Sequence, residues 1–65
     1  MTRMTVTEVR RWWLRHYETR ANRNARYAEE SAAAGDDEWA DVYRLQAMAD
    51  RAEATRIAND MGGEA

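Results

Sequence analysis

The fold of this chain is decided by residues 32–40, which read AAAGDDEWA. The alanines favour helix, whereas Gly35 suits the left-handed backbone conformation that commonly ends a helix. Asp36 or Asp37 can then cap a second helix by accepting a hydrogen bond from its first turn. The stretch therefore predicts one helix that ends at Ala34, a tight turn, and a second helix directly after it.

The start of the first helix is predicted by Thr5 and Glu8, which have the spacing of a capping box. No helix breaker follows before Gly35, because the chain has no proline and its other glycines are at 62 and 63. Spacings of three and four place Val6, Val9, Trp13, Tyr17, Ala21, Asn24, Ala28 and Ala32 on one face. The predicted elements are helix 6–34, turn 35–37, helix 37–61 and a frayed tail 62–65.

A turn this short makes the two helices antiparallel neighbours. Residues whose numbers sum to about 70 should then lie level with each other, given equal rise on both helices. The pairs that this register predicts are Trp13/Ile57, Ala21/Ala49, Tyr27/Tyr43, Arg10/Asp60 and Arg20/Asp50.

The second helix carries two apolar stripes, and one neighbouring helix can cover only one of them. One stripe holds Val42, Leu45, Ala49 and Ala52, and the other holds Trp39, Tyr43, Ala47, Ala54, Ile57 and Met61. The stripe left over, with Trp12 and Leu14 of the first helix, needs another partner. We expect a second copy of the chain to supply it. The predicted fold is therefore all-α, an antiparallel two-helix hairpin that dimerises into a four-helix bundle.

Composition limits what chemistry the chain can perform. Its 65 residues include no cysteine and one histidine, so disulfides, thiolate zinc sites and an all-imidazole metal site are excluded. His16 has no serine or cysteine at a spacing that suggests a catalytic pair. We expect no enzyme activity, no cofactor and no metal.

Location and origin are indicated only by what the sequence contains. No run of 18 apolar residues and no secretory signal is present, which favours a cytoplasmic protein without a membrane partner. All ten basic residues are arginine, and alanine is abundant. This composition is typical of GC-rich coding and suggests a high-GC bacterium or its phage.

Charge is divided between the two predicted helices. Residues 1–28 carry seven arginines against two glutamates, and residues 29–65 carry ten acidic residues against three arginines. The simplest interpretation is that opposite charges on antiparallel helices favour their pairing.

Two other interpretations give these charges a function in nucleic-acid biology. In one, the first helix contacts phosphates through Arg10, Arg11, Arg15, Arg23 and Arg26, and Trp12, Trp13 and Tyr17 stack on bases. The helical wheel places Arg20 and Arg23 away from the face shared by Arg11, Arg15 and Arg26. In the other, an acidic run mimics a phosphate backbone and so inhibits a nucleic-acid enzyme. That run consists of Glu29, Glu30, Asp36, Asp37, Glu38 and Asp41.

The hypothesis that fits the whole chain best is a non-enzymatic protein-interaction or regulatory protein. Tryptophan, tyrosine and arginine dominate the energetics of such interfaces. The candidate interaction residues are Trp12, Trp13, Tyr17, Trp39 and Tyr43.

Overall fold

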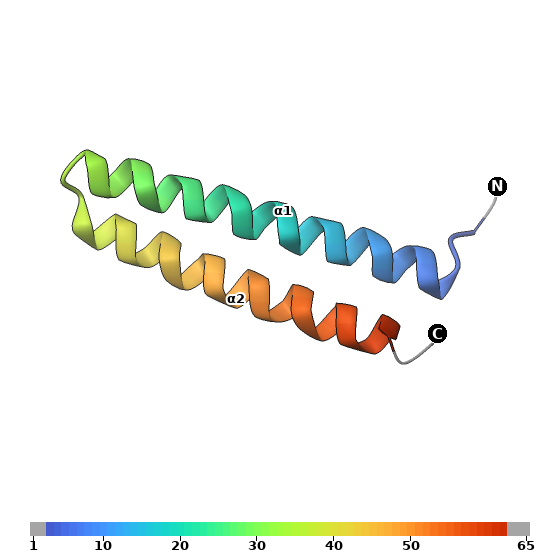
Figure 1. The fold of residues 1–65 in the computed structure, drawn as a ribbon. Helices are drawn as coiled ribbons and strands as arrows, with labels where there is room; N and C mark the ends of the chain where they lie inside the picture. Colours follow the sequence, from blue (N-terminus) through green and yellow to red (C-terminus); the bar gives the residue numbers. More distant parts are fainter. Residues whose placement is uncertain (1–2, 63–65) are drawn as a thin grey trace.

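A computed structural model describes residues 3–62 as two long antiparallel helices joined by a short turn (Figure 1). Helix α1 spans Val6–Ala33 with 28 residues, and helix α2 spans Asp37–Gly62 with 26 residues. Gly62 closes α2, and the remainder of the predicted tail, 63–65, lies outside the described residues. The Cα extents of 47 × 28 × 12 Å describe a slab one layer thick. The all-α hairpin is therefore the fold of this chain.

The first turn of α1 is held by the Thr5 side chain. Thr5 has extended backbone angles, and its Oγ1 accepts a hydrogen bond from the Glu8 amide at 3.1 Å. The Thr5 hydroxyl also donates to Glu8 Oε1 at 3.2 Å, so the Glu8 carboxylate reaches back to the hydroxyl of the capping residue. These bonds satisfy the first turn and start α1 at Val6.

The turn is a Schellman motif built on Gly35, whose φ of 81° lies in the left-handed region. The Asp36 amide donates to the Ser31 carbonyl at 2.8 Å, and the Gly35 amide donates to the Ala32 carbonyl at 3.0 Å. Asp36 Oδ1 then accepts from the Trp39 amide at 3.3 Å and caps α2. One aspartate thus joins both helix ends, which explains why three residues are enough to reverse the chain.

Alanines seven residues apart form the seam between the helices. The buried apolar residues are Ala21, Ala28, Ala40, Ala47 and Ala54. A spacing of seven keeps the same side of each helix against its neighbour, as in a coiled coil. Among the described residues no large side chain is fully buried, so the hairpin has a close but thin core.

A polar layer interrupts these alanines at the middle of the seam. Asn24 and Asp50 are both buried, and Asn24 Nδ2 donates a hydrogen bond to Asp50 Oδ2 at 2.9 Å. The Nε of Arg20 lies 3.5 Å from the other Asp50 oxygen, Oδ1, at the solvent edge of this layer. The buried carboxylate therefore faces a donor on one side and a positive charge on the other.

The predicted register is correct on one side of the seam and wrong at its centre. Arg20 pairs with Asp50, and the rings of Tyr27 and Tyr43 lie 5.4 Å apart, as predicted. Ala21 does not face Ala49, because Ala49 is exposed while Ala21 is buried. At the seam centre the numbers of facing residues sum to about 74, as in the contact between Asn24 and Asp50, and this register places Ala54 opposite Ala21. The pairs Trp13/Ile57 and Arg10/Asp60 stay predictions.

Of the two stripes on α2, the one that contains Tyr43 faces α1. Its members Ala47 and Ala54 are buried, and Tyr43, Ile57 and Met61 are half-buried. The other stripe, with Val42 and Leu45, is exposed on the outer edge of α2. The side of α2 that faces α1 carries Ala40, Ala47 and Ala54 at spacings of seven, and this row of small side chains lets the two helix backbones approach closely.

Candidate interaction surfaces

Two pairs of residues that meet across the seam define one broad face of the slab. Arg20 and Tyr27 are seven residues apart on α1, and Tyr43 and Asp50 are seven residues apart on α2. Residues separated by seven lie on the same side of a helix. Trp13 is seven residues before Arg20 and joins the same face, which we call the aromatic face.

An aromatic cluster occupies this face near the turn. The ring of Tyr43 lies 5.4 Å from that of Tyr27 and 5.8 Å from that of Trp39, measured between centroids. Trp39 and Tyr27 are exposed, and Tyr43 is half-buried between them. Ring contacts of this kind hold aromatic side chains in place while leaving area available to a partner.

A second aromatic cluster lies near the start of α1 and consists of Trp12, Trp13, His16 and Tyr17. Trp13 contacts Trp12 edge to face at 5.0 Å and stacks on Tyr17 at 5.8 Å. Trp12 stacks on His16, with centroids 5.2 Å apart and an interplanar angle of 8°. Trp13 and Tyr27 are 14 residues apart on α1, so the two clusters are separated by roughly 21 Å.

The five predicted interaction residues thus belong to two separate clusters. Trp12, Trp13 and Trp39 are exposed, whereas Tyr17 and Tyr43 are half-buried and packed within the chain. The sequence did not identify Tyr27 as a member. Its pairing with Tyr43 in the predicted register was the signal that could have revealed it.

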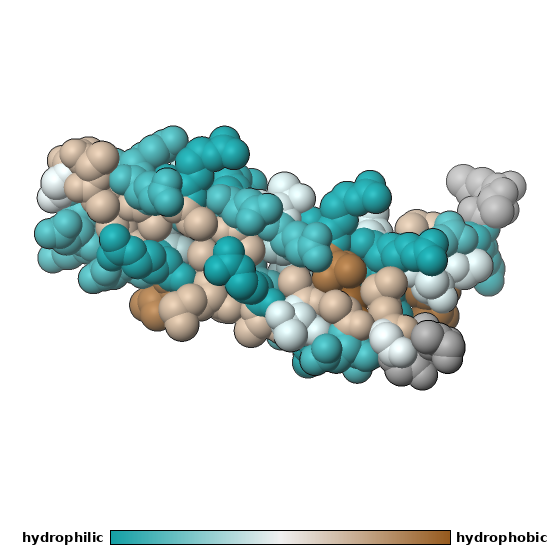
Figure 2. Space-filling model, in the orientation of Figure 1, coloured by the Kyte–Doolittle hydropathy of each residue, from teal (hydrophilic) through white to brown (hydrophobic). Residues whose placement is uncertain are grey.

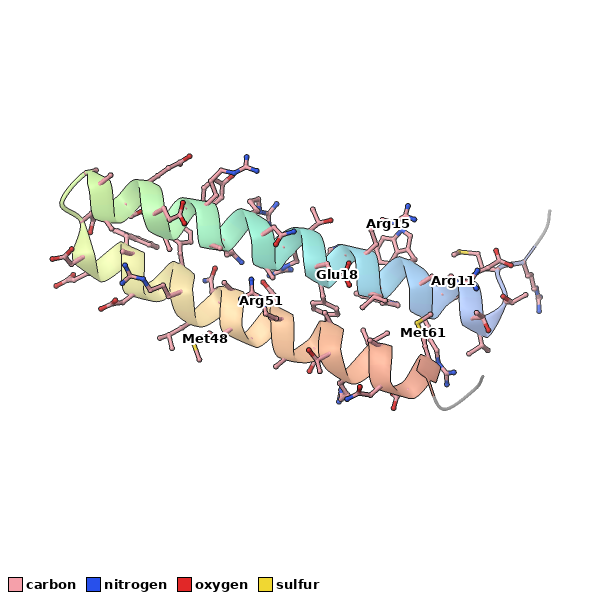
Figure 3. All side chains as sticks on the ribbon, in the orientation of Figure 1. Arg11, Arg15, Glu18, Met48, Arg51 and Met61 are labelled. Carbon is pink, nitrogen blue, oxygen red and sulfur yellow. The ribbon has the colours of Figure 1, made fainter. Side chains whose placement is uncertain are left out.

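A shallow groove on α1 brings together some of the predicted phosphate contacts. Arg15 and Arg23 line it, and Arg20 joins them, together with Trp12, His16 and Thr19. The expectation that Arg20 and Arg23 lie well away from Arg15 is not met, since all three residues line this groove; arginine side chains reach well beyond their Cα positions. In Figure 3, Arg15 extends from α1 on the side away from α2.

The other three predicted phosphate contacts do not line this groove. Arg11 and Arg26 are exposed elsewhere on α1, and Arg10 is half-buried. The structure therefore divides the predicted basic patch instead of gathering it.

The outer edge of α2 is apolar near its middle. Leu45 and Met48 are 66% and 65% exposed, Val42 is 40% exposed, and Ala49 and Ala52 are also exposed. Met48 projects from α2 away from α1 in Figure 3, and Figure 2 shows hydrophobic atoms at this edge of the molecule. We call Val42, Leu45, Met48, Ala49 and Ala52 the α2 stripe.

The second broad face is polar and carries opposite charges. Glu18 and Arg51 line one shallow groove with Ala21 and Ala54, and they lie between the two helices in Figure 3. Glu29 and Arg44 line a second groove beside it. Arg44 also pairs with Asp41 of its own helix at 2.8 Å. These exposed charges contribute little to stability individually.

Two further properties limit the kinds of site on residues 3–62. Within that range no group of three or more histidine, aspartate or glutamate side chains is placed to hold a metal ion. Neither α1 nor α2 has the length and apolar character needed to cross a membrane.

Comparison with protein-family models, with curated proteins and with solved structures gives no match to this chain. Function is therefore inferred from the surfaces themselves.

Proposed function

We propose that this chain is a non-enzymatic protein-interaction module that works as a homodimeric helical hairpin. The observation that carries the proposal is its surface area. The chain exposes 5285 Å², whereas a compact monomer of 7.6 kDa exposes about 4,300 Å². The excess of about 1,000 Å² is close to the area of about 800 Å² that each partner buries in a standard protein interface.

The α2 stripe is the surface that fits a second copy. If two α2 helices pack antiparallel through their stripes, about a two-fold axis at the level of Ala47 along the helix, residue numbers across the interface sum to 94. Leu45 then lies opposite the partner subunit's Ala49, and Val42 lies opposite the partner subunit's Ala52. Val42 and Leu45 therefore each meet an alanine, which allows close packing, while Met48 lies level with the partner subunit's Gln46 at the border of the stripe.

Charge supports the same arrangement. Glu38 lies toward the start of α2 and Arg56 toward its end, each more than two turns from the centre of the stripe. Their numbers also sum to 94. Both are exposed, and each would lie opposite the other's copy across the two-fold axis. An antiparallel dimer thus places opposite charges at both ends of the interface, whereas a parallel pairing would place like charges together.

The dimer leaves the aromatic face uncovered, and we assign contact with a second protein to it. Trp13 and Trp39 offer exposed aromatic area at fixed positions, which is the usual character of interface hot spots. A protein that the wild type captures, and that the double variant Trp13→Ala with Trp39→Ala no longer captures, would support this assignment. Equal capture by the double variant would contradict it.

The dimer is tested by mass in solution. Sedimentation at about 50 μM should give twice the mass of one chain, and Leu45→Glu should give a folded monomer because it places two buried charges at the interface. Val6→Glu is the matched control, since Val6 is 67% exposed and lies on α1. A monomeric wild type, or a Leu45→Glu variant that remains dimeric, would rule out this interface.

A further inference from the structure

The groove on α1 combines an aromatic ring with three arginine side chains, and all six lining residues come from this one helix. They are Trp12, Arg15, His16, Thr19, Arg20 and Arg23. The α2 stripe lies on the other helix, so the proposed dimer leaves this groove open. What the groove binds is thus a question separate from self-association.

The Trp12 indole is held in position by its neighbours. It stacks almost parallel on His16, and the Trp13 ring meets it edge to face at 5.0 Å. Even so, Trp12 is 53% exposed. A ring that is fixed on two sides and open on another presents a planar surface on which a second planar group can stack at little cost in side-chain entropy.

The three arginines line the groove beside this ring. Arg15 and Arg23 are eight residues apart, or about 12 Å along the helix, and Arg20 lies between them. Asp50 holds Arg20 by its Nε edge. The guanidinium group has five N–H donors, so its terminal nitrogens can still meet an anion in the groove.

Asp50 of α2 offsets the charge of Arg20, but other acidic side chains are few along this part of α1. Between residues 9 and 28 the sequence has six arginines and one acid, Glu18. Glu18 lines a different groove, with Arg51 and Ala54 at the seam. The local charge is therefore strongly positive although the whole chain has a formal net charge of −2.

We infer that this groove binds single-stranded nucleic acid, with one base stacked on Trp12 and neighbouring phosphates on Arg15, Arg20 and Arg23. Proteins that bind single-stranded nucleic acid without sequence preference stack bases on aromatic side chains and contact the phosphates with positively charged ones. A duplex keeps its bases stacked within the helix, so it offers no free base to Trp12. An acidic peptide offers charge and no planar face.

The test is fluorescence anisotropy with an end-labelled dT12 oligonucleotide at several salt concentrations between 50 and 200 mM. Three phosphate contacts predict a slope of log affinity against log salt of about −2. Arg15→Ala and Arg23→Ala should each reduce the slope by about 0.7. Trp12→Ala should weaken binding about 5- to 150-fold at an unchanged slope, and Trp12→Phe should recover part of the loss.

Arg51→Ala is the matched control, because it removes the same charge from the other broad face. The Leu45→Glu monomer should still bind the oligonucleotide, so failure of the proposed dimer and failure of this site can be told apart. Absence of saturable binding at 50 mM salt would overturn the inference. So would equal losses with Arg51→Ala, an unaffected Trp12→Ala variant, or equal affinity for duplex DNA or polyglutamate.

Discussion

Replacement of the buried carboxylate of Asp50 tests whether the polar layer is needed for stability. Asp50→Ala leaves the Asn24 side-chain amide, which is 4% exposed, without its acceptor. The cost is the lost hydrogen bond to a charged group together with the desolvation of an unpaired donor, about 2–3 kcal/mol in all. The Arg20 contact adds little to this figure, because that side chain is 44% exposed.

A loss of this size is a large fraction of the total. A domain of this length has roughly 3–10 kcal/mol of stability. With a urea m-value of about 1 kcal/mol per molar, the unfolding midpoint should fall by about 2–3 M. Urea titration followed by circular dichroism measures the shift. The Leu45→Glu background removes any dependence on protein concentration that self-association would introduce.

The double variant distinguishes an interaction from two independent effects. Asn24→Ala leaves a buried carboxylate short of a donor and should cost about 2 kcal/mol. Asn24→Ala with Asp50→Ala removes both partners and extends the alanine seam, so its loss should be about 1 kcal/mol or less. If the double variant loses as much as the two single variants together, to within about 0.5 kcal/mol, the reasoning fails.

Three further substitutions test the turn, the cap and the seam by the same titration. Gly35→Ala should cost about 1 kcal/mol, because the added Cβ meets nothing within 4 Å and the whole penalty comes from the positive φ; no loss would contradict a left-handed Gly35. Thr5→Ala should lower the free energy of unfolding by about 1 kcal/mol through loss of the cap, and Thr5→Ser should retain the stability of the wild type. An unchanged stability of Thr5→Ala would show that the cap does not stabilise α1. Ala47→Leu should cost 1–3 kcal/mol or more by overpacking the seam. Ala49→Leu, two residues later on the exposed side, should leave the hairpin intact and weaken only the proposed dimer.

Local signals in the sequence were enough to predict the hairpin. Thr5, Gly35 and Asp36 act through the backbone within a few residues of themselves, so their effects do not depend on the rest of the molecule. The charge pair Arg20/Asp50 and the ring pair Tyr27/Tyr43 followed from counting residues out from the turn. Counting could not separate residues at the centre of the seam from those beside it, which is why Ala21 was paired with Ala49.

The surfaces were harder to predict than the fold, for two reasons. The choice between the two stripes of α2 depends on how closely the backbones approach, and that is a property of both helices together. The α1 groove depends on the ends of arginine side chains, which reach well beyond their Cα positions. A helical wheel records only the direction of each Cα, and so it separated Arg20 and Arg23 from Arg15 although all three line one groove.

Because alanines recur every seven residues along the seam, the alanine contacts alone do not fix how α1 is aligned along α2. If α1 shifted along α2 by one repeat, so that Ala21 met Ala47 and Ala28 met Ala40, two alanine layers would still form. Asn24 would then meet Tyr43 in place of Asp50, and its amide would lose its carboxylate acceptor. The buried Asn24–Asp50 hydrogen bond and the three-residue turn, with the Arg20–Asp50 and Tyr27–Tyr43 contacts beside the seam, thus distinguish the observed alignment from its translated copies. A chain that lacked these features would sample several alignments of nearly equal energy.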